Sequence, residues 1–342
     1  MKRERLFYLD FVRAAATLII VLTHFNAWYL YTSPAMPEKA VFSLWFGNIY
    51  IGEVGVSLFL ILSGAALMYV YENHLNIKQF YKKRFLNIYP LFWLVYLAAF
   101  LFEFYRNQGI NTSVPKYRII YSLLGMDTYS LVLGGPPNFA IVGEWFLGMI
   151  IFFYLLFPLL RKWMLVHPIS LYITVNTVYV LCIFINRDGE VLPKTLPMLL
   201  PRVLFGMCFV KYKWKIKLPV ALISVIIIAF NGRLPIKIDM SLQSTYIGIA
   251  LFCILVYAAG WLRRVTAVKN MCAVICRYSY AIFICHHIII NYMVMAFDLN
   301  TISRFNSYLL FLCCCCAIFI AAVVFQKIHD CIMNRIFIVQ KS

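Results

Sequence analysis

Arg13 and His24 lie eleven residues apart in the first apolar segment of the chain. At 100° per residue in an α-helix, eleven steps return a side chain to within about 20° of its starting direction. The two side chains therefore share one helix face, roughly 16 Å apart along the axis. Asp10 falls on the same face, three residues before Arg13. Ionisable groups inside a membrane helix cost several kcal/mol, so this stripe indicates a functional path.

Other ionisable side chains occur in or beside the apolar segments. A structural role is the alternative for each: a lone membrane His is often a packing residue, Arg84 ends a basic loop, and Glu144 could be an interfacial carboxylate. His286 and His287 are adjacent, about 100° apart, so only one of them easily faces a given cavity. Together the groups occupy several expected depths, with His24, Glu53, Glu144, Arg202, His286 and His287 toward the outside and Asp10, Arg13, Arg84 and Arg277 toward the cytoplasm.

These residue types suit acid–base chemistry on one side and phosphate binding on the other. A neutral imidazole such as His24 can take a proton from a sugar hydroxyl near neutral pH, and Glu144 could orient it. The forked, permanent cations of Arg13 and Arg84 suit a phosphate-bearing ligand. The pattern fits acyl transfer from a cytoplasmic phosphorylated thioester to an external hydroxyl. Transport is not excluded by these residues alone.

The composition is that of a polytopic membrane protein. The 342 residues are 63% hydrophobic and only 13% charged, whereas soluble proteins contain about 25% charged residues. The basic N-terminal residues lead into a long apolar segment, which predicts a first transmembrane helix and not a cleaved signal. The net charge of +18 is distributed among loops, where membrane topology explains it, so we expect no nucleic-acid partner.

Ten apolar segments are expected to cross a bilayer of about 30 Å. Of the 31 Lys and Arg residues, 20 fall on the side of the N-terminus and nine on the other, with two inside the spans. Because cytoplasmic loops are enriched in Lys and Arg, both termini are predicted to be cytoplasmic. We expect an all-α integral membrane protein with a single domain over 1–342 and no appended soluble domain. The expected spans are 10–31, 49–71, 87–104, 141–160, 168–186, 195–210, 218–231, 243–262, 278–297 and 306–326.

The eleven cysteines form neither a disulfide pattern nor a metal-ligand spacing, so we expect no metal site. Four of them, Cys313 to Cys316, lie inside one apolar segment and are interpreted as packing residues, with S-acylation as the alternative. The longest loop, about 105–140, is placed outside and is expected to contain a short helix near 116–126. Loops of this length usually have a binding or lid role, or are disordered.

Five segments in order resemble the acyltransferase family 3 membrane proteins, and they extend over nearly the whole chain. Each motif alone is weak, but their common order is specific. They are the Arg-x10-His pattern of Arg13 and His24, the segment Gly55 to Gly64, the segment Phe80 to Pro90 with Arg84, the segment Glu144 to Leu147 with Tyr154 and Pro158, and Ser279-Tyr280 with His286.

The resemblance implies a bacterial ten-helix enzyme of the cytoplasmic (inner) membrane. Such proteins move an acetyl group from cytoplasmic acetyl-CoA to a hydroxyl of a surface polysaccharide or its lipid-linked precursor. It implies His24 as catalytic residue beside Glu144, with Arg13 and Arg84 binding acetyl-CoA. Asp10, Arg202, Tyr280 and His286 are further candidates. Membrane lipids and glycan-assembly proteins are the expected partners.

Three positions depart from the family pattern. Asn87 stands where a second Arg is expected after Arg84, Ser57 where Asp is frequent, and Ile150 where many members have Glu. The alternatives are a multi-pass transporter or flippase of a glycan or lipid, and a structural subunit of a glycan-assembly complex. Transporters often contain inverted repeats, and this sequence contains no evident repeat, which disfavours transport.

Overall fold

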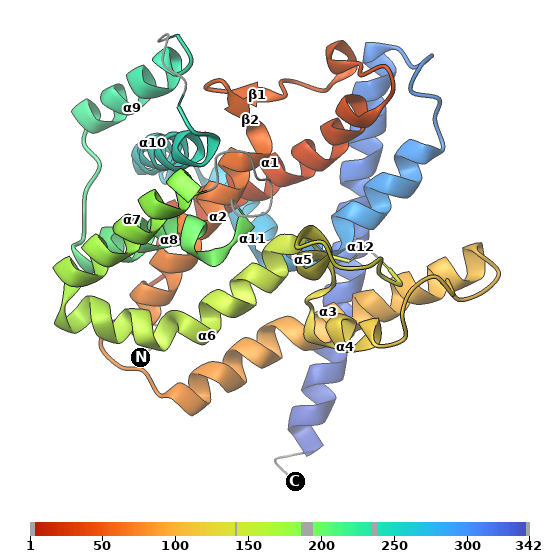
Figure 1. The fold of residues 1–342 in the computed structure, drawn as a ribbon, viewed down its shortest axis with the longest axis horizontal. Helices are drawn as coiled ribbons and strands as arrows, with labels where there is room; N and C mark the ends of the chain where they lie inside the picture. Colours follow the sequence, from red (N-terminus) through yellow and green to blue (C-terminus); the bar gives the residue numbers. More distant parts are fainter. Residues whose placement is uncertain (1–3, 141, 186–193, 234–237, 340–342) are drawn as a thin grey trace. The chain divides into compact units, whose positions relative to one another are not determined.

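The computed structural model of the chain is built almost entirely of helices (Figure 1). It describes residues 4–140, 142–185, 194–233 and 238–339, with side chains to residue 335. The strands in this part of the chain form one two-stranded antiparallel ladder, β1 (Trp45–Phe46) with β2 (Ile49–Tyr50). The predicted all-α class is therefore confirmed.

Eight helices in the described residues are long and apolar enough to cross a membrane, and the chain is a multi-pass membrane protein. The other two expected spans, 195–210 and 218–231, are also helical. They form α8 (Leu196–Lys211) and α9 (Leu218–Phe230), which are shorter than a full crossing needs. A ten-span topology thus stays a prediction. The eight long helices are α1 (Phe7–Tyr31), α2 (Ile51–Tyr71), α3 (Ile77–Arg106), α6 (Trp145–Val166), α7 (Pro168–Ile185), α10 (Met240–Leu262), α11 (Thr266–Met295) and α12 (Arg304–Val339).

Three helices extend well beyond the apolar stretches that predicted them. α3 and α11 begin about ten residues early, and α12 continues to Val339 past the expected end at 326. Hydropathy marks the lipid-facing stretch, whereas caps end a helix. α3 begins where the Asn76 side chain accepts a hydrogen bond from the backbone N–H of Gln79 at 3.0 Å. Two boundaries of the predicted spans, residues 141 and 186, lie outside the described residues. The same holds for five of the basic residues counted in the predicted loops, namely Lys2, Arg3, Arg187, Lys237 and Lys341.

The contacts divide the chain into two compact units. Unit 1 comprises Met1–Asn26, Phe42–Leu75 and Leu155–Arg277, and unit 2 comprises Ala27–Val41, Asn76–Tyr154 and Tyr278–Ser342. α1, α6 and α11 contribute residues to both units. The core of unit 1 gathers buried side chains of four helices, namely Val12 of α1, Leu58 and Ile61 of α2, Phe209 of α8 and Phe252 of α10.

Two glycines allow α2 and α8 of unit 1 to touch along their backbones. A Cβ built on Gly64 would lie 2.0 Å from the carbonyl oxygen of Val203. One on Gly206 would lie 2.0 Å from the carbonyl oxygen of Ile61. No side chain fits at either point, so the crossing depends on glycine in both helices.

In unit 2, α3 packs beside α12 and also holds the following segment in place (Figure 1). The predicted short helix is α4 (Arg118–Leu124), and a second one, α5 (Asp127–Val132), follows it without having been predicted. Side chains one turn apart on α3 bind the end of α4. Trp93 Nε1 donates to the carbonyl of Leu123 at 2.9 Å, and the Tyr89 hydroxyl donates to that of Leu124 at 3.1 Å.

A buried arginine organises the connection between α3 and α6. Arg118 is fully buried and donates to Ser130 Oγ at 2.8 Å, to the carbonyl of Asp127 at 3.2 Å and to the side-chain oxygen of Asn138. The Asp127 carboxylate lies 4.0 Å from the guanidinium, and burial raises the pKa of Asp127. The loop is therefore a folded element with its own polar centre.

Candidate functional site

In unit 1, Arg13 and His24 both lie within α1, as their spacing predicts, and both are half-buried. The helix around them is fixed by local contacts. The Thr17 hydroxyl donates to the carbonyl of Arg13 at 2.9 Å. The Tyr50 hydroxyl donates to the carbonyl of Thr23 at 3.1 Å, which ties the turn that contains His24 to the start of α2. Hydrogen bonds to backbone carbonyls therefore fix α1 at Arg13 and next to His24.

Helix spacing places Asp10 on the same face as Arg13, but the structure gives the Asp10 carboxylate Arg5 as a partner. Its carboxylate accepts a hydrogen bond from Arg5 Nε, and this bond raises the pKa of Arg5. The backbone carbonyl of Asp10 accepts from Cys276 Sγ at 3.2 Å. These contacts connect the segment before α1, the first turn of α1, and α11 within unit 1. They give Asp10 a structural role.

Arg202, another predicted candidate, lies at the centre of a buried polar network in unit 1. Its side chain is 1% exposed, and it donates from Nε to Thr245 Oγ1 at 3.0 Å and from Nη2 to Ser244 Oγ at 2.9 Å. Thr245 also bonds the Tyr179 hydroxyl of α7 at 3.0 Å, and Ser57 of α2 donates to the carbonyl of Ser244 at 2.9 Å. Arg202 thus connects α8 to α10, with α7 and α2 joined through the same hydroxyl-bearing residues.

In unit 2, Glu144 is placed beside α11 by the turn that precedes α6. Gly143 adopts a positive φ of 68°, and its N–H donates to the carbonyl of Ile284 at 3.2 Å. This backbone contact brings Glu144 Oε1 to 3.6 Å from His287 Nε2. The two side chains are 12% and 24% exposed, respectively, so the attraction between a carboxylate and an imidazolium would be little weakened by solvent there.

His286 is fully buried next to this pair. Its Nδ1 lies 2.7 Å from the carbonyl of Phe283 and 3.2 Å from that of Ile282. A carbonyl oxygen only accepts, so Nδ1 carries the proton, and in the neutral imidazole Nε2 has the basic lone pair. A carboxylate oxygen of Glu144 lies within 4.8 Å of a ring nitrogen of His286. One carboxylate thus lies near both imidazoles.

His287 is the residue that sequence reasoning did not select. The argument that two adjacent side chains diverge by about 100° favoured a single histidine facing the cavity. The structure instead places Glu144 near both rings, whose centroids are 6.3 Å apart. The usable signal was the His-His pair itself, which is uncommon in an apolar span.

Arg84 and Tyr280 belong to a second cluster of unit 2. The Arg84 guanidinium lies 5.4 Å from the ring centre of Tyr154 and 5.7 Å from that of Phe80, within cation–π range. The Tyr280 hydroxyl donates to the carbonyl of Ile88 at 3.0 Å. Residues of α3, α6 and α11 therefore meet here, and the aromatic rings hold the Arg84 cation in position.

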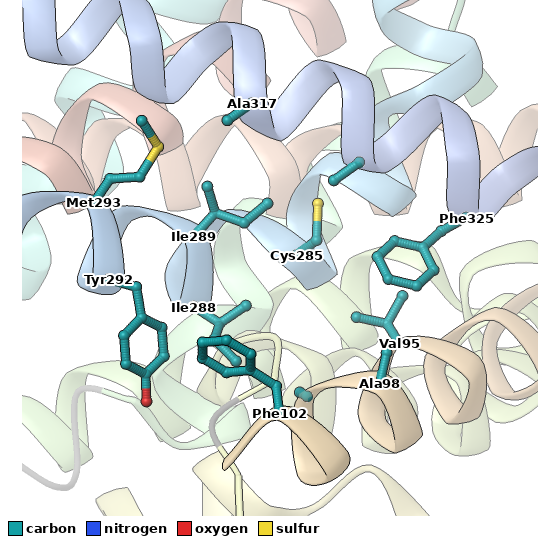
Figure 2. A pocket seen from close by; sticks show the side chains of 12 residues that line it. Val95, Ala98, Phe102, Cys285, Ile288, Ile289, Tyr292, Met293, Ala317 and Phe325 are labelled. Carbon is teal, nitrogen blue, oxygen red and sulfur yellow. The ribbon is translucent and has the colours of Figure 1, made fainter. Parts of the chain in front are cut away.

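The apolar cavity of unit 2 contains none of the predicted site residues. It has a volume of about 380 Å³ and lies between α3, α11 and α12, with Phe102 and Tyr292 toward one end and Val95 and Phe325 toward the other (Figure 2). Its lining has no charged group to bind the phosphates of a donor or the hydroxyls of a sugar. The predicted site residues therefore lie outside this cavity, in the polar clusters described above.

The comparison with known families shows which family the chain resembles. A family model described as an acyltransferase domain matches residues 6–327, which include every site candidate named above. No curated protein and no solved structure matches the chain.

Proposed function

Because the chain belongs to the acyltransferase family 3, whose model covers nearly all of it, we propose that it is a membrane O-acetyltransferase. The acetyl donor is cytoplasmic acetyl-CoA. The acceptor is a hydroxyl of an extracytoplasmic polysaccharide, such as a capsule, O-antigen or exopolysaccharide, or of its lipid-linked precursor. The protein acts in the cytoplasmic membrane of a bacterium.

In the proposed reaction, His24 is the general base. It takes the proton of the acceptor hydroxyl as that oxygen attacks the thioester carbonyl carbon. The carbon–sulfur bond then breaks, and the CoA thiolate leaves and receives a proton, so that the products are an acetyl ester and free CoA. Glu144 is the second proposed catalytic residue, and its negative charge favours the proton transfer. Arg13 and Arg84 bind the donor phosphates.

One observation carries the proposal beyond family membership. Glu144, His286 and His287 bring a carboxylate and two imidazoles together beside the apolar helices α6 and α11. Ionisable groups are retained at such places for proton handling or ligand binding far more often than for packing. This composition supports acid–base chemistry on a hydroxyl.

The test is acetyl transfer by the full-length protein. Membranes containing the wild type, His24→Ala or His74→Ala are supplied with acetyl-labelled CoA, and labelled glycan is measured by mass spectrometry. His74 is the matched control, because it lies exposed in the connection between α2 and α3. We expect His24→Ala to reduce transfer by about a hundredfold or more, and His74→Ala to leave it unchanged.

Three results would contradict the proposal. Full acetylation by His24→Ala would remove the assigned base. Glycan or lipid flux across the membrane without any acetyl consumption would instead identify a transporter. If the wild type shows neither flux nor acetyl transfer but still assembles with partner proteins, it is a structural subunit.

A further inference from the structure

A groove between the first turns of α3 and the last turns of α12 is lined mainly by polar side chains, in contrast to the apolar cavity of unit 2. Its volume is about 360 Å³, in the range of small-ligand sites. Two lysines, two side-chain amides and one imidazole supply its polar groups, and no carboxylate lines it. The lining residues are Gln79, Lys82, Lys83, Leu86, Asn87, His329 and Met333.

The α3 side of the groove is a single helix face. The lining residues of α3 recur at intervals of three or four positions, from Gln79 to Lys82 and Lys83 and then to Leu86. This spacing places them in one stripe along the helix. Arg84 belongs to a different face, because its guanidinium packs against the rings of Phe80 and Tyr154. The groove is therefore a second basic site on α3, separate from Arg84.

The α12 side contributes a histidine whose ring is oriented by a carboxylate. His329 Nδ1 lies 3.0 Å from Asp330 Oδ1, and Gln326 Nε2 donates to the same oxygen at 2.8 Å. His329 Nε2 is buried and has no hydrogen-bond partner among the described residues. Because Nδ1 bonds Asp330, Nε2 is the ring nitrogen that remains for a ligand.

The position of the groove along the helices indicates which anions can reach it. On both helices it begins where the apolar stretch ends, near Leu86 of α3 and Gln326 of α12. Phosphate groups of lipids, and of soluble ligands that approach the bilayer, are found at this level of a membrane protein. Lysine ammonium groups bind phosphate oxygens as point charges, and amides supply further donors.

We propose that this groove is a binding site for a phosphate group, in which Lys82 and Lys83 provide the charge and Gln79, Asn87 and His329 the remaining hydrogen bonds. Two sources share this chemistry: the headgroup of an anionic phospholipid, and the phosphates of CoA. The CoA source rests on the proposed function, whereas the lipid source does not. In either case Asn87, which departs from the family pattern, serves as a neutral donor within a lysine site.

The test measures ligand-induced thermal stabilisation of the purified full-length protein. The two probes are CoA added to protein in detergent, and nanodiscs of phosphatidylcholine with phosphatidylglycerol compared with nanodiscs of phosphatidylcholine alone. The variant is Lys82→Gln with Lys83→Gln. The matched control is Lys215→Gln with Lys217→Gln, which removes two exposed lysines from the connection between α8 and α9.

We expect at least one probe to stabilise the wild type and the Lys215/Lys217 control variant equally. The same probe should bind the Lys82/Lys83 variant at least about tenfold more weakly. Loss of the phosphatidylglycerol effect identifies the lipid source, and loss of the CoA effect identifies the donor. If neither probe depends on Lys82 and Lys83 more than on Lys215 and Lys217, the proposal is wrong. Because no acetyl transfer is read, failure of the proposed enzyme activity would leave this result intact.

Discussion

Glu144 is placed by a turn and not by a helix, and its neighbours come from a distant part of the chain. The Gly143 N–H bonds the carbonyl of Ile284, and this contact sets Glu144 beside His286 and His287. Helix periodicity predicts the shared face of Arg13 and His24 because both lie on one helix. It cannot reveal a pairing across some 140 residues of sequence, which depends on tertiary packing.

At this scale we predict that Glu144 supports turnover through its histidine neighbours. Glu144→Gln keeps the shape of the side chain but removes the charge that stabilises an imidazolium. We expect turnover to fall by about a hundredfold, with little change in the KM for acetyl-CoA. His287→Ala should lower turnover as well, and the double variant should be no worse than the more severe single one, because the two residues act as a unit.

The matched control for this prediction is Glu38→Gln, an exposed carboxylate in the short 3-10 helix Pro37–Lys39. It should leave the kinetics unchanged. Steady-state acetylation rates at varied acetyl-CoA concentration provide the measurement. Effects of Glu144→Gln and His287→Ala that simply multiply would contradict a shared role.

At the scale of elements, the apolar segments were predicted well and their connections less so. Each of the ten expected spans coincides with a helix, because apolar length is a local property. The early start of α3 depends on the Asn76 cap, and the folded loop depends on Arg118, a residue that the charge pattern assigned only to an external loop. Burial of such a side chain is decided by partners far along the chain.

The crossing of α2 and α8 leads to a prediction at this scale. Gly206→Ala would place a methyl group where the carbonyl of Ile61 now lies, so the two helices would have to separate. We expect a loss of about 3 kcal/mol or more in the free energy of unfolding, seen as a lower apparent Tm of the detergent-solubilised protein. The other helix contacts of unit 1 would be strained in consequence.

Gly260→Ala provides the control on α10. A Cβ there would meet nothing within 4 Å, so the substitution should be neutral, or stabilising by about 1 kcal/mol through higher helix propensity. An equal effect of the two substitutions would show that the close contact of α2 and α8 does not limit stability.

For the whole molecule, the distribution of charge predicts orientation in the membrane. The excess of Lys and Arg on the side of the N-terminus, 20 against nine, predicts cytoplasmic termini and ten crossings. The structure supplies helices at all ten positions, although α8 and α9 are short. Which helices cross completely depends on the surrounding bilayer, and neither hydropathy nor helix length decides it for a 13-residue helix.

Reporter fusions test this topology. Alkaline phosphatase inserted after Gly109, in the connection between α3 and α4, should be active because that connection is predicted to be external. The same enzyme inserted after Arg264, between α10 and α11, should be inactive, and green fluorescent protein at the C-terminus should fluoresce. An active phosphatase after Arg264 would refute the ten-span arrangement.

The buried network of Arg202 also constrains how the protein is made. A helix of 16 residues with a central arginine is a poor substrate for insertion into lipid on its own. The hydroxyl groups that bond this arginine belong to Ser244 and Thr245, more than 40 residues later in the chain. We therefore expect α8 to become stable in the bilayer only after α10 has been made and can supply these hydroxyl groups.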